Sequence, residues 1–209
     1  NTTGAANTAV GRTALFTNQT TSNLTAVGYA ALYANTTGTN GVAVGKDALQ
    51  SNTTGDNNTA VGLESLQTNT TGDNNTACGT GALALNSTAD DNTAVGRAAL
   101  GVNSTGTRNV AVGTRTLDAN TTGLNNVAVG CDSMTNNTTG NDNVAVGREA
   151  LQYNTTGYHN TAIGQESMKG AGSSAAYNNT AVGHNSAKAI TTGHHNTLIG
   201  QTAGDDITT

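Results

Sequence analysis

The segment NTTGDNNTAVGLESLQT, residues 52–68, decides the fold, because versions of it follow one another along the whole chain. Its glycine before the leucine returns every 17 residues, at positions 11, 28, 45, 62, 79, 96, 113, 130, 147 and 164. The next two equivalents are Gly183 and Gly200, so one two-residue insertion falls near residues 169–176. Periods of this length are typical of repeat architectures. The sequence predicts one repeat array over residues 1–209, with twelve copies and a thirteenth begun at residue 207.

The columns of the repeat, numbered 1 to 17 from Asn1, predict one short strand in each copy. Column 8 is Thr or Val in all twelve copies, column 10 is Val or Ile except at Cys78, and column 9 between them is Ala in eleven. Alternation of β-branched residues with period two is typical of a strand. Column 15 is Leu or Met in the first ten copies. We expect columns 8, 10 and 15 to face inward, which makes Cys78 a buried replacement for Val.

The remaining columns predict turns that close each copy into a coil. Asn-Thr-Thr-Gly in columns 1 to 4 and the Gly of column 11 are turn residues, because Gly permits positive φ and Asn bonds to its own backbone. Successive coils then stack in parallel about 4.8 Å apart. The fold class expected is all-β, a parallel β-solenoid (β-roll or β-helix) of twelve 17-residue coils.

Composition excludes several classes of function. The chain has 27 Gly and no Pro, aromatic residues make up 3%, and charged residues 10% against about 25% in an average domain. Its eight basic residues are scattered and its net charge is -5, which argues against nucleic acid as a partner. The longest apolar run, residues 29–34, is far shorter than the roughly 20 residues of a membrane-spanning helix.

The strings Asn-Thr-Ala-Val-Gly at 7–11, 58–62 and 92–96, with Asn-Thr-Thr-Gly between them and Ala-Leu after them, closely resemble repeats of bacteriophage and bacterial tail-fibre-like proteins. More distantly, the Val-Gly strand resembles the head repeats of trimeric autotransporter adhesins. The first resemblance implies an extracellular, elongated shaft. The second implies a left-handed coil and a trimer. Because the chain starts and stops on a repeat boundary, we also expect a segment of a longer fibre.

The turn of columns 1 to 4 is a candidate for glycosylation, because Asn-x-Ser/Thr recurs there once per coil. The same pattern follows from turn preference alone, and both interpretations stay open. Ice binding by the regular Thr column is a further alternative. The candidate acceptors are Asn1, Asn18, Asn35, Asn52, Asn69, Asn86, Asn103, Asn120, Asn137 and Asn154, with Thr3, Thr20, Thr37, Thr54 and Thr71 for O-linked sugars.

Association with copies of the same chain, as a trimer or a filament, is the expected partnership, because a thin roll buries little surface alone. The small side chains of column 9 suit close packing between chains. The candidate packing residues are Ala9, Ala26, Ala43, Ala60, Ala77 and Ala94.

No catalytic, cofactor or metal site is predicted. His159, His184, His194 and His195 lack a carboxylate or Cys at ligand spacing, and no nucleophile, base and orienting group recur together. Tyr153, Tyr158 and Tyr177 could instead stack on a sugar. The function expected is a shaft segment of an extracellular fibre rather than an enzyme, and the alternative is an adhesin that binds host glycans.

Overall fold

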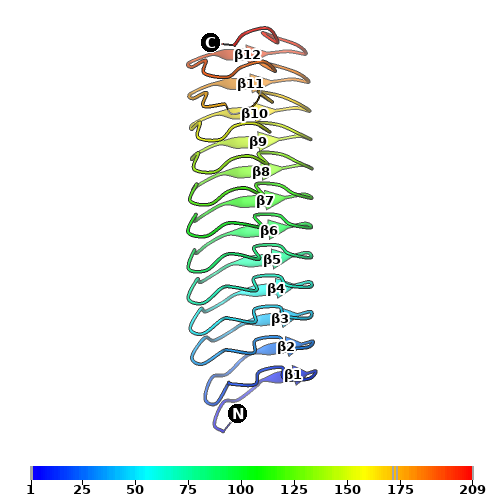
Figure 1. Ribbon diagram of the computed structural model, residues 1–209, viewed down its shortest axis with the longest axis vertical. Helices are drawn as coiled ribbons and strands as arrows, with labels where there is room; N and C mark the ends of the chain where they lie inside the picture. The colour runs from blue at the N-terminus through cyan, green and yellow to red at the C-terminus, as the bar shows by residue number, and fades with distance from the viewer. Residues whose placement is uncertain (1, 171, 173, 209) are drawn as a thin grey trace.

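The computed structural model describes residues 2–170, 172 and 174–208, which form a straight stack of coils with one strand in each (Figure 1). Each strand is three residues long and occupies columns 8 to 10 of its repeat. Among the described residues there is no helix, and so none that could span a bilayer. The strands are β1 (Thr8–Val10), β2 (Thr25–Val27), β3 (Val42–Val44), β4 (Thr59–Val61), β5 (Thr76–Cys78), β6 (Thr93–Val95), β7 (Val110–Val112), β8 (Val127–Val129), β9 (Val144–Val146), β10 (Thr161–Ile163), β11 (Thr180–Val182) and β12 (Thr197–Ile199).

The twelve strands form a single parallel sheet in sequence order, which confirms the predicted all-β parallel solenoid. Each residue pairs with the residue one repeat later, as Thr8 does with Thr25. The step is longer only between β10 and β11, where Thr161 pairs with Thr180. Because the pairing register resumes without a shift, the extra residues are confined to the connection at one corner. Part of that insertion, residues 171 and 173, lies outside the described residues.

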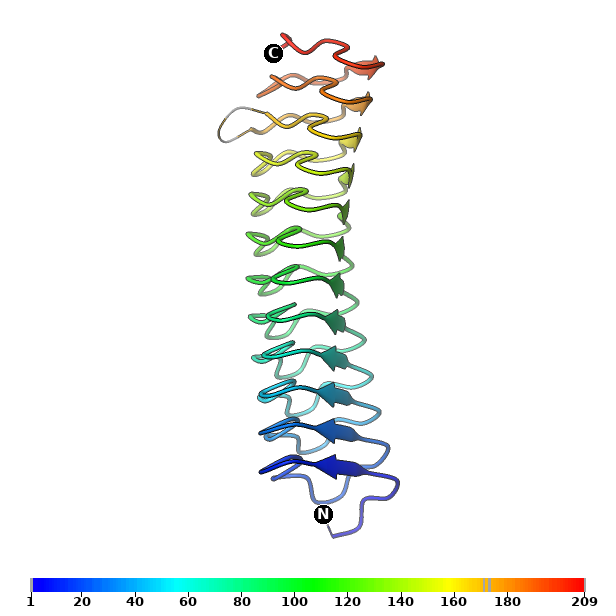
Figure 2. The same cartoon turned by 90° about the vertical axis from the view of Figure 1, so that its right-hand side faces the viewer.

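The sheet runs along one side of the stack (Figure 2). Its interior face carries alanine rather than the β-branched residues. Ala26 to Ala181 of column 9 are fully buried, whereas Val10 and Ile199 are 58% and 71% exposed and Val61, at mid-array, 38%. The expectation that columns 8 and 10 face inward is therefore wrong. Neither phase of the strand is charged, and opposite a Leu or Met of column 15 the coil holds only a methyl group in column 9. In the last coil, where column 15 is Gly204, Leu198 takes the column 9 position and packs against the core.

Column 15 packs against the alanines from the opposite side, as predicted. Leu32, Leu49 and the equivalents up to Met168 are buried, and they form one continuous cluster with the column 9 alanines. These leucines adopt positive φ, for example 49° at Leu49, a region that costs a residue with a Cβ roughly 1–2 kcal/mol. Burial of a large side chain and the bond from Leu49 N to Ser65 O, 3.0 Å, offset that strain.

Glycine in column 11 follows each strand because the next coil lies too close for a side chain. At Gly130 φ is 131°, and a Cβ would stand 2.6 Å from the carbonyl oxygen of Gly147. The other equivalents before Gly200 meet the same obstacle. This column therefore determines how tightly successive coils can stack.

The side of the coil that lacks leucine is filled by two internal ladders of asparagine. In the first Asn ladder, each Nδ2 donates to Oδ1 of the Asn one coil earlier, as Asn103 does to Asn86 at 2.9 Å. In the second, each Oδ1 accepts the backbone N–H of the Asn one coil later, as Asn92 does from Asn109 at 3.0 Å. The first Asn ladder comprises Asn35, Asn52, Asn69, Asn86, Asn103, Asn120, Asn137 and Asn154. The second comprises Asn58, Asn75, Asn92, Asn109, Asn126, Asn143, Asn160, Asn179 and Asn196.

Both ladders meet at the carbonyl group of column 4. The Gly106 oxygen accepts from Asn103 Nδ2 of its own coil and from Asn92 Nδ2 of the preceding coil, both at 2.9 Å. Since buried amides are costly unless they are bonded, these shared acceptors explain how a polar residue type can fill half of the interior.

Candidate functional site

The asparagines predicted to carry N-linked sugars lie inside the rod. Asn18 is 1% exposed, Asn52 is 2% exposed, and Asn35 and the six equivalents from Asn69 to Asn154 are fully buried. From Asn35 to Asn154 their amides are the rungs of the first Asn ladder, so Nδ2 is already a donor to two acceptors. Asn18 Nδ2 donates to Thr21 O at 3.3 Å. The glycosylation prediction for Asn18 to Asn154 of column 1 is therefore wrong, because a sugar on these buried amides would displace the side chains packed inside the coil. Asn1 lies outside the described residues.

The threonines of column 3 lie on the surface instead. They line one edge of the stack, and we call this row the Thr edge. It comprises Thr3, Thr20, Thr37, Thr54, Thr71, Thr88, Thr105, Thr122, Thr139, Thr156 and Thr192, all of them exposed. The candidates for O-linked sugars are thus accessible. Ice-binding surfaces need a plane of side chains, and this single file of hydroxyl groups on a turn does not provide one.

Four further Asn-x-Thr triplets lie in column 6, on the outer side of the coil. Asn23, Asn57 and Asn74 are exposed and Asn178 is half-buried. All four adopt positive φ between 56° and 62°, a conformation that Asn tolerates better than most residues. Their side chains form an outer ladder, with Asn57 Nδ2 donating to Asn74 Oδ1 at 3.2 Å.

The alanines predicted to pack chains together cannot do so. Ala26, Ala43, Ala60, Ala77 and Ala94 are fully buried within their own chain. Only Ala9, in the first coil, is exposed. The surface available to a neighbour is the outer sheet face, which we define as the column 8 and column 10 side chains of β1 to β12. Every one of these 24 side chains is Thr, Val, Ile or Cys, so this face carries no charge.

Cys78 lies on the outer sheet face and is exposed, not buried as expected. Cys131 is also free and exposed, and its Sγ contacts Asp132 Oδ2 at 3.4 Å. The hydrogen bond to that carboxylate raises the pKa of the Cys131 thiol, which reduces the fraction of reactive thiolate at neutral pH.

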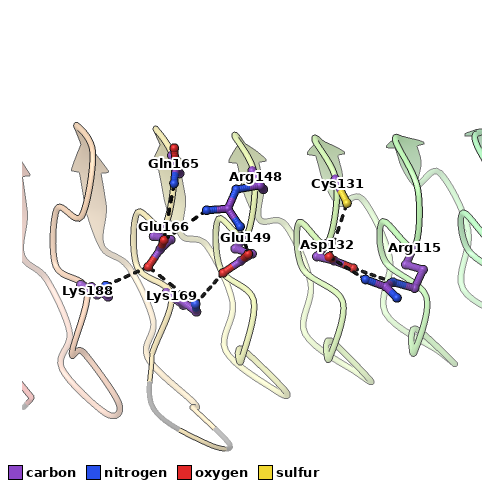
Figure 3. A network of polar contacts seen from close by, with 9 residues as sticks. All are labelled: Arg115, Cys131, Asp132, Arg148, Glu149, Gln165, Glu166, Lys169 and Lys188. Atoms are coloured by element: carbon purple, nitrogen blue, oxygen red, sulfur yellow. Dashed lines mark hydrogen bonds and ion pairs between the residues drawn. The ribbon is translucent and has the colours of Figure 1, made fainter.

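Charged residues of columns 12, 13 and 16 gather at one corner between the seventh and the eleventh coil (Figure 3). Arg115 holds Asp132 through two parallel bonds of 2.8 Å. Further along, Lys188 Nζ lies 2.8 Å and Lys169 Nζ 3.6 Å from Glu166 Oε2. The bond from Lys188 lowers the pKa of Glu166 to about 2. Positive and negative side chains alternate along neighbouring coils and pair with one another. These charges are therefore partnered within the chain.

An aromatic stack runs along column 5 in the last coils. Tyr158 and Tyr177 have ring centroids 5.1 Å apart, and Tyr177 and His194 are 4.8 Å apart. Because Tyr177 is stacked between Tyr158 and His194, both of its faces are covered by the stack itself, whereas Tyr158 is 41% exposed. Among the described residues, no group of three or more His, Cys, Asp or Glu side chains could hold a metal ion.

Tyr153 makes no ring contact with this stack among the described residues. It lines an open hollow of about 410 Å³ together with Asn136, Thr138 and Thr155. The hollow lies next to the insertion, and its polar groups are of the kind that hydrogen-bond a sugar. Of the three tyrosines proposed from the sequence, Tyr153 is the one with open space beside it.

The two Asn ladders are the feature that the residue pattern indicated least directly. A signal was nevertheless present, because Leu24 stands in the Asn column 7 and Ile190 in the Asn column 1. Both are 1% exposed. Apolar replacements in an otherwise polar column point to an interior position.

Comparisons with models of protein families, with curated proteins and with solved structures each found no match to this chain.

Proposed function

We propose that this chain is a rigid structural rod, a shaft segment of an extracellular fibre. The observation that carries the proposal is the unbroken register from β1 to β12, in which every coil is bonded to the next through the sheet. The internal Asn ladders add side-chain bonds through the centre of the stack. No two neighbouring coils are joined by the main chain alone, so the described array has no hinge. The extracellular setting rests on the resemblance to tail-fibre-like repeats.

The rod proposal predicts that length follows repeat number. With neighbouring strands about 4.8 Å apart, β1 and β12 lie about 53 Å from each other. A variant that lacks residues 52–68 should remain folded and be about 5 Å shorter, and one that duplicates them should be about 5 Å longer. Small-angle scattering on both variants measures the change in maximum dimension. A chain whose dimension does not follow the repeat number, although it keeps its β-sheet circular dichroism, would not be a rod of this kind.

Lateral association belongs to the same proposal, but on a different surface from the one predicted. The outer sheet face is uncharged and rich in Val, and sheets pack face to face through such surfaces at about 10 Å. Light scattering should show a multimer for the native chain and a monomer for Val112→Lys. A multimer that survives this substitution would place the contact elsewhere.

A second candidate is adhesion to a glycan at the hollow beside Tyr153. The observation that favours it is a half-buried aromatic ring next to open space and three polar side chains. A glycan array probed with the native chain and with Tyr153→Ala tests this function. Equal binding by the two proteins, or binding by neither, would leave the rod as the better account.

A further inference from the structure

The hydroxyl groups of the Thr edge form a regular polar array that the fold itself does not use within the described residues. In the neighbouring column 2 the hydroxyl groups tie coils together, as Thr53 Oγ1 does by donating to Thr70 O at 2.9 Å. No bond of this kind is made within the described residues by Thr54 Oγ1 or by its column 3 equivalents. These hydroxyl groups are therefore free to react or to bind something outside the chain.

The turn does not explain why column 3 is threonine. Other exposed columns change freely between copies: column 5 includes Asp73, Leu124 and Tyr158. Column 3 is Thr in eleven of twelve copies, and the exception, Ala175, lies in the copy with the insertion. Turn chemistry would accept Ser, Asn, Asp or Gly there. Because the Thr hydroxyl makes no bond within the chain, its recurrence points to recognition from outside.

The backbone holds these hydroxyl groups in a rigid row. Thr37 N donates to Thr53 O at 3.0 Å and Thr54 N donates to Thr70 O at 3.1 Å, and most other residues of the Thr edge are anchored to the following coil in the same way. Rotation about χ1 of Thr is restricted by its branched Cβ. Acceptors therefore recur about every 4.8 Å, a spacing that lets sugar rings lie side by side. The asparagines two residues earlier are buried and closed to the same chemistry.

We propose that the Thr edge is a row of acceptors for O-linked sugars. Thr Oγ1 attacks the anomeric carbon of a sugar activated as a nucleotide or polyprenyl phosphate ester, in the active site of a transferase from the producing cell. The Oγ1–C1 bond forms, and the bond from C1 to the phosphate oxygen breaks. The phosphate leaves with the electron pair, and the hydroxyl proton passes to a base of the transferase. The inference goes beyond the rod proposal, since a bare rod and a glycosylated one have the same length.

The short tryptic peptide of residues 98–108 provides a sharp test, because it places Asn103, Ser104, Thr105 and Thr107 in one fragment. The chain isolated from its native source is denatured, digested and fragmented by electron transfer, which leaves sugars on their side chains. The expected result is a peptide heavier by one or more monosaccharide residues, with the added mass on Thr105. Alkaline β-elimination should remove that mass. The Thr105→Ala variant, produced in the native source, should lack it.

The peptide of residues 170–188 is the internal control, since it carries Ala175 in column 3. We expect it to be unmodified on its Ser and Thr residues. A bare peptide 98–108 from native material overturns the proposal, as does a sugar located on Asn103 or Thr107. Neither outcome affects the scattering test of rod length.

Discussion

Replacing Asn103 by Ala tests whether the first Asn ladder stabilises the rod. The substitution removes three hydrogen bonds: Asn103 Nδ2 to Asn86 Oδ1 at 2.9 Å, Asn103 Nδ2 to Gly106 O at 2.9 Å, and Asn120 Nδ2 to Asn103 Oδ1 at 2.8 Å. At about 1 kcal/mol net for each bond, the loss is about 3 kcal/mol. The structure also shows which groups lose their last partner. The Gly106 carbonyl retains the bond from Asn92, but Asn86 Oδ1 is left buried without a donor, which adds to the cost.

The matched control is Thr105→Ala, two residues away on the same turn but on the exposed Thr edge. It should change the free energy of unfolding by less than about 0.5 kcal/mol, as surface substitutions usually do. Denaturant unfolding followed by far-ultraviolet circular dichroism compares the unfolding free energies of the two variants, provided that both depend on denaturant concentration with the same slope. Because repeat arrays can unfold in parts, hydrogen exchange around β6 and β7 shows where stability is lost. If Asn103→Ala lost less than about 1 kcal/mol, or no more than Thr105→Ala, the ladder would be a consequence of stacking and not a cause of stability.

Three further predictions concern the stacking, the strand and the charged corner. Gly130→Ala should destabilise the chain by more than about 2 kcal/mol, because its Cβ would lie 2.6 Å from the carbonyl oxygen of Gly147. The control Gly81→Ala has open space around it and should cost about 1 kcal/mol for its positive φ. Equal midpoints of thermal unfolding for the two variants would refute the close contact. Ala111→Leu should lower the melting temperature by several degrees through overpacking, and Val112→Leu, on the outer sheet face, should leave it nearly unchanged. If Val112→Leu lowered the melting temperature more than Ala111→Leu, the strand would face the other way. The depressed pKa of Glu166, about 2, means that its contribution is fully present above pH 4.5 and is lost as pH falls from 4.5 toward 2. Glu166→Gln should therefore narrow the difference in stability between pH 6 and pH 2.5, and an unchanged difference would show that the pair with Lys188 contributes nothing.

The fold was largely predictable because the period, the strand columns and the Leu column are repeated signals that reinforce one another. Thr8, Ala9 and Val10 predicted β1, and the fixed step of 17 predicted parallel in-register pairing. What the pattern could not decide was the phase of the strand. A period-two pattern indicates which face is interior only when one phase is polar. In Thr-Ala-Val both phases can be buried. Which face of the strand lies inside depends on the width of the coil, and the sequence of a single repeat does not reveal that width.

The surfaces were harder to predict than the fold, for a related reason. Asn52 and Thr54 belong to the same Asn-Thr-Thr-Gly segment, and both residue types are typical of exposed turns. One is buried and the other exposed because a stacked coil offers Asn a partner amide in the adjacent coil, a contact that exists only between copies. Sequence patterns within one repeat contain no information about it, whereas the apolar replacements Leu24 and Ile190 do.

The column 11 glycine and the shared column 4 acceptor make every coil a suitable neighbour for every other, so the array can gain or lose whole units without a new interface. In genetic terms the unit is a run of seventeen codons, and recombination between misaligned copies would add or remove one while preserving the reading frame and the stacking together. The length of the rod is then an inherited copy number, open to adjustment within a population by events that leave no coil unpaired.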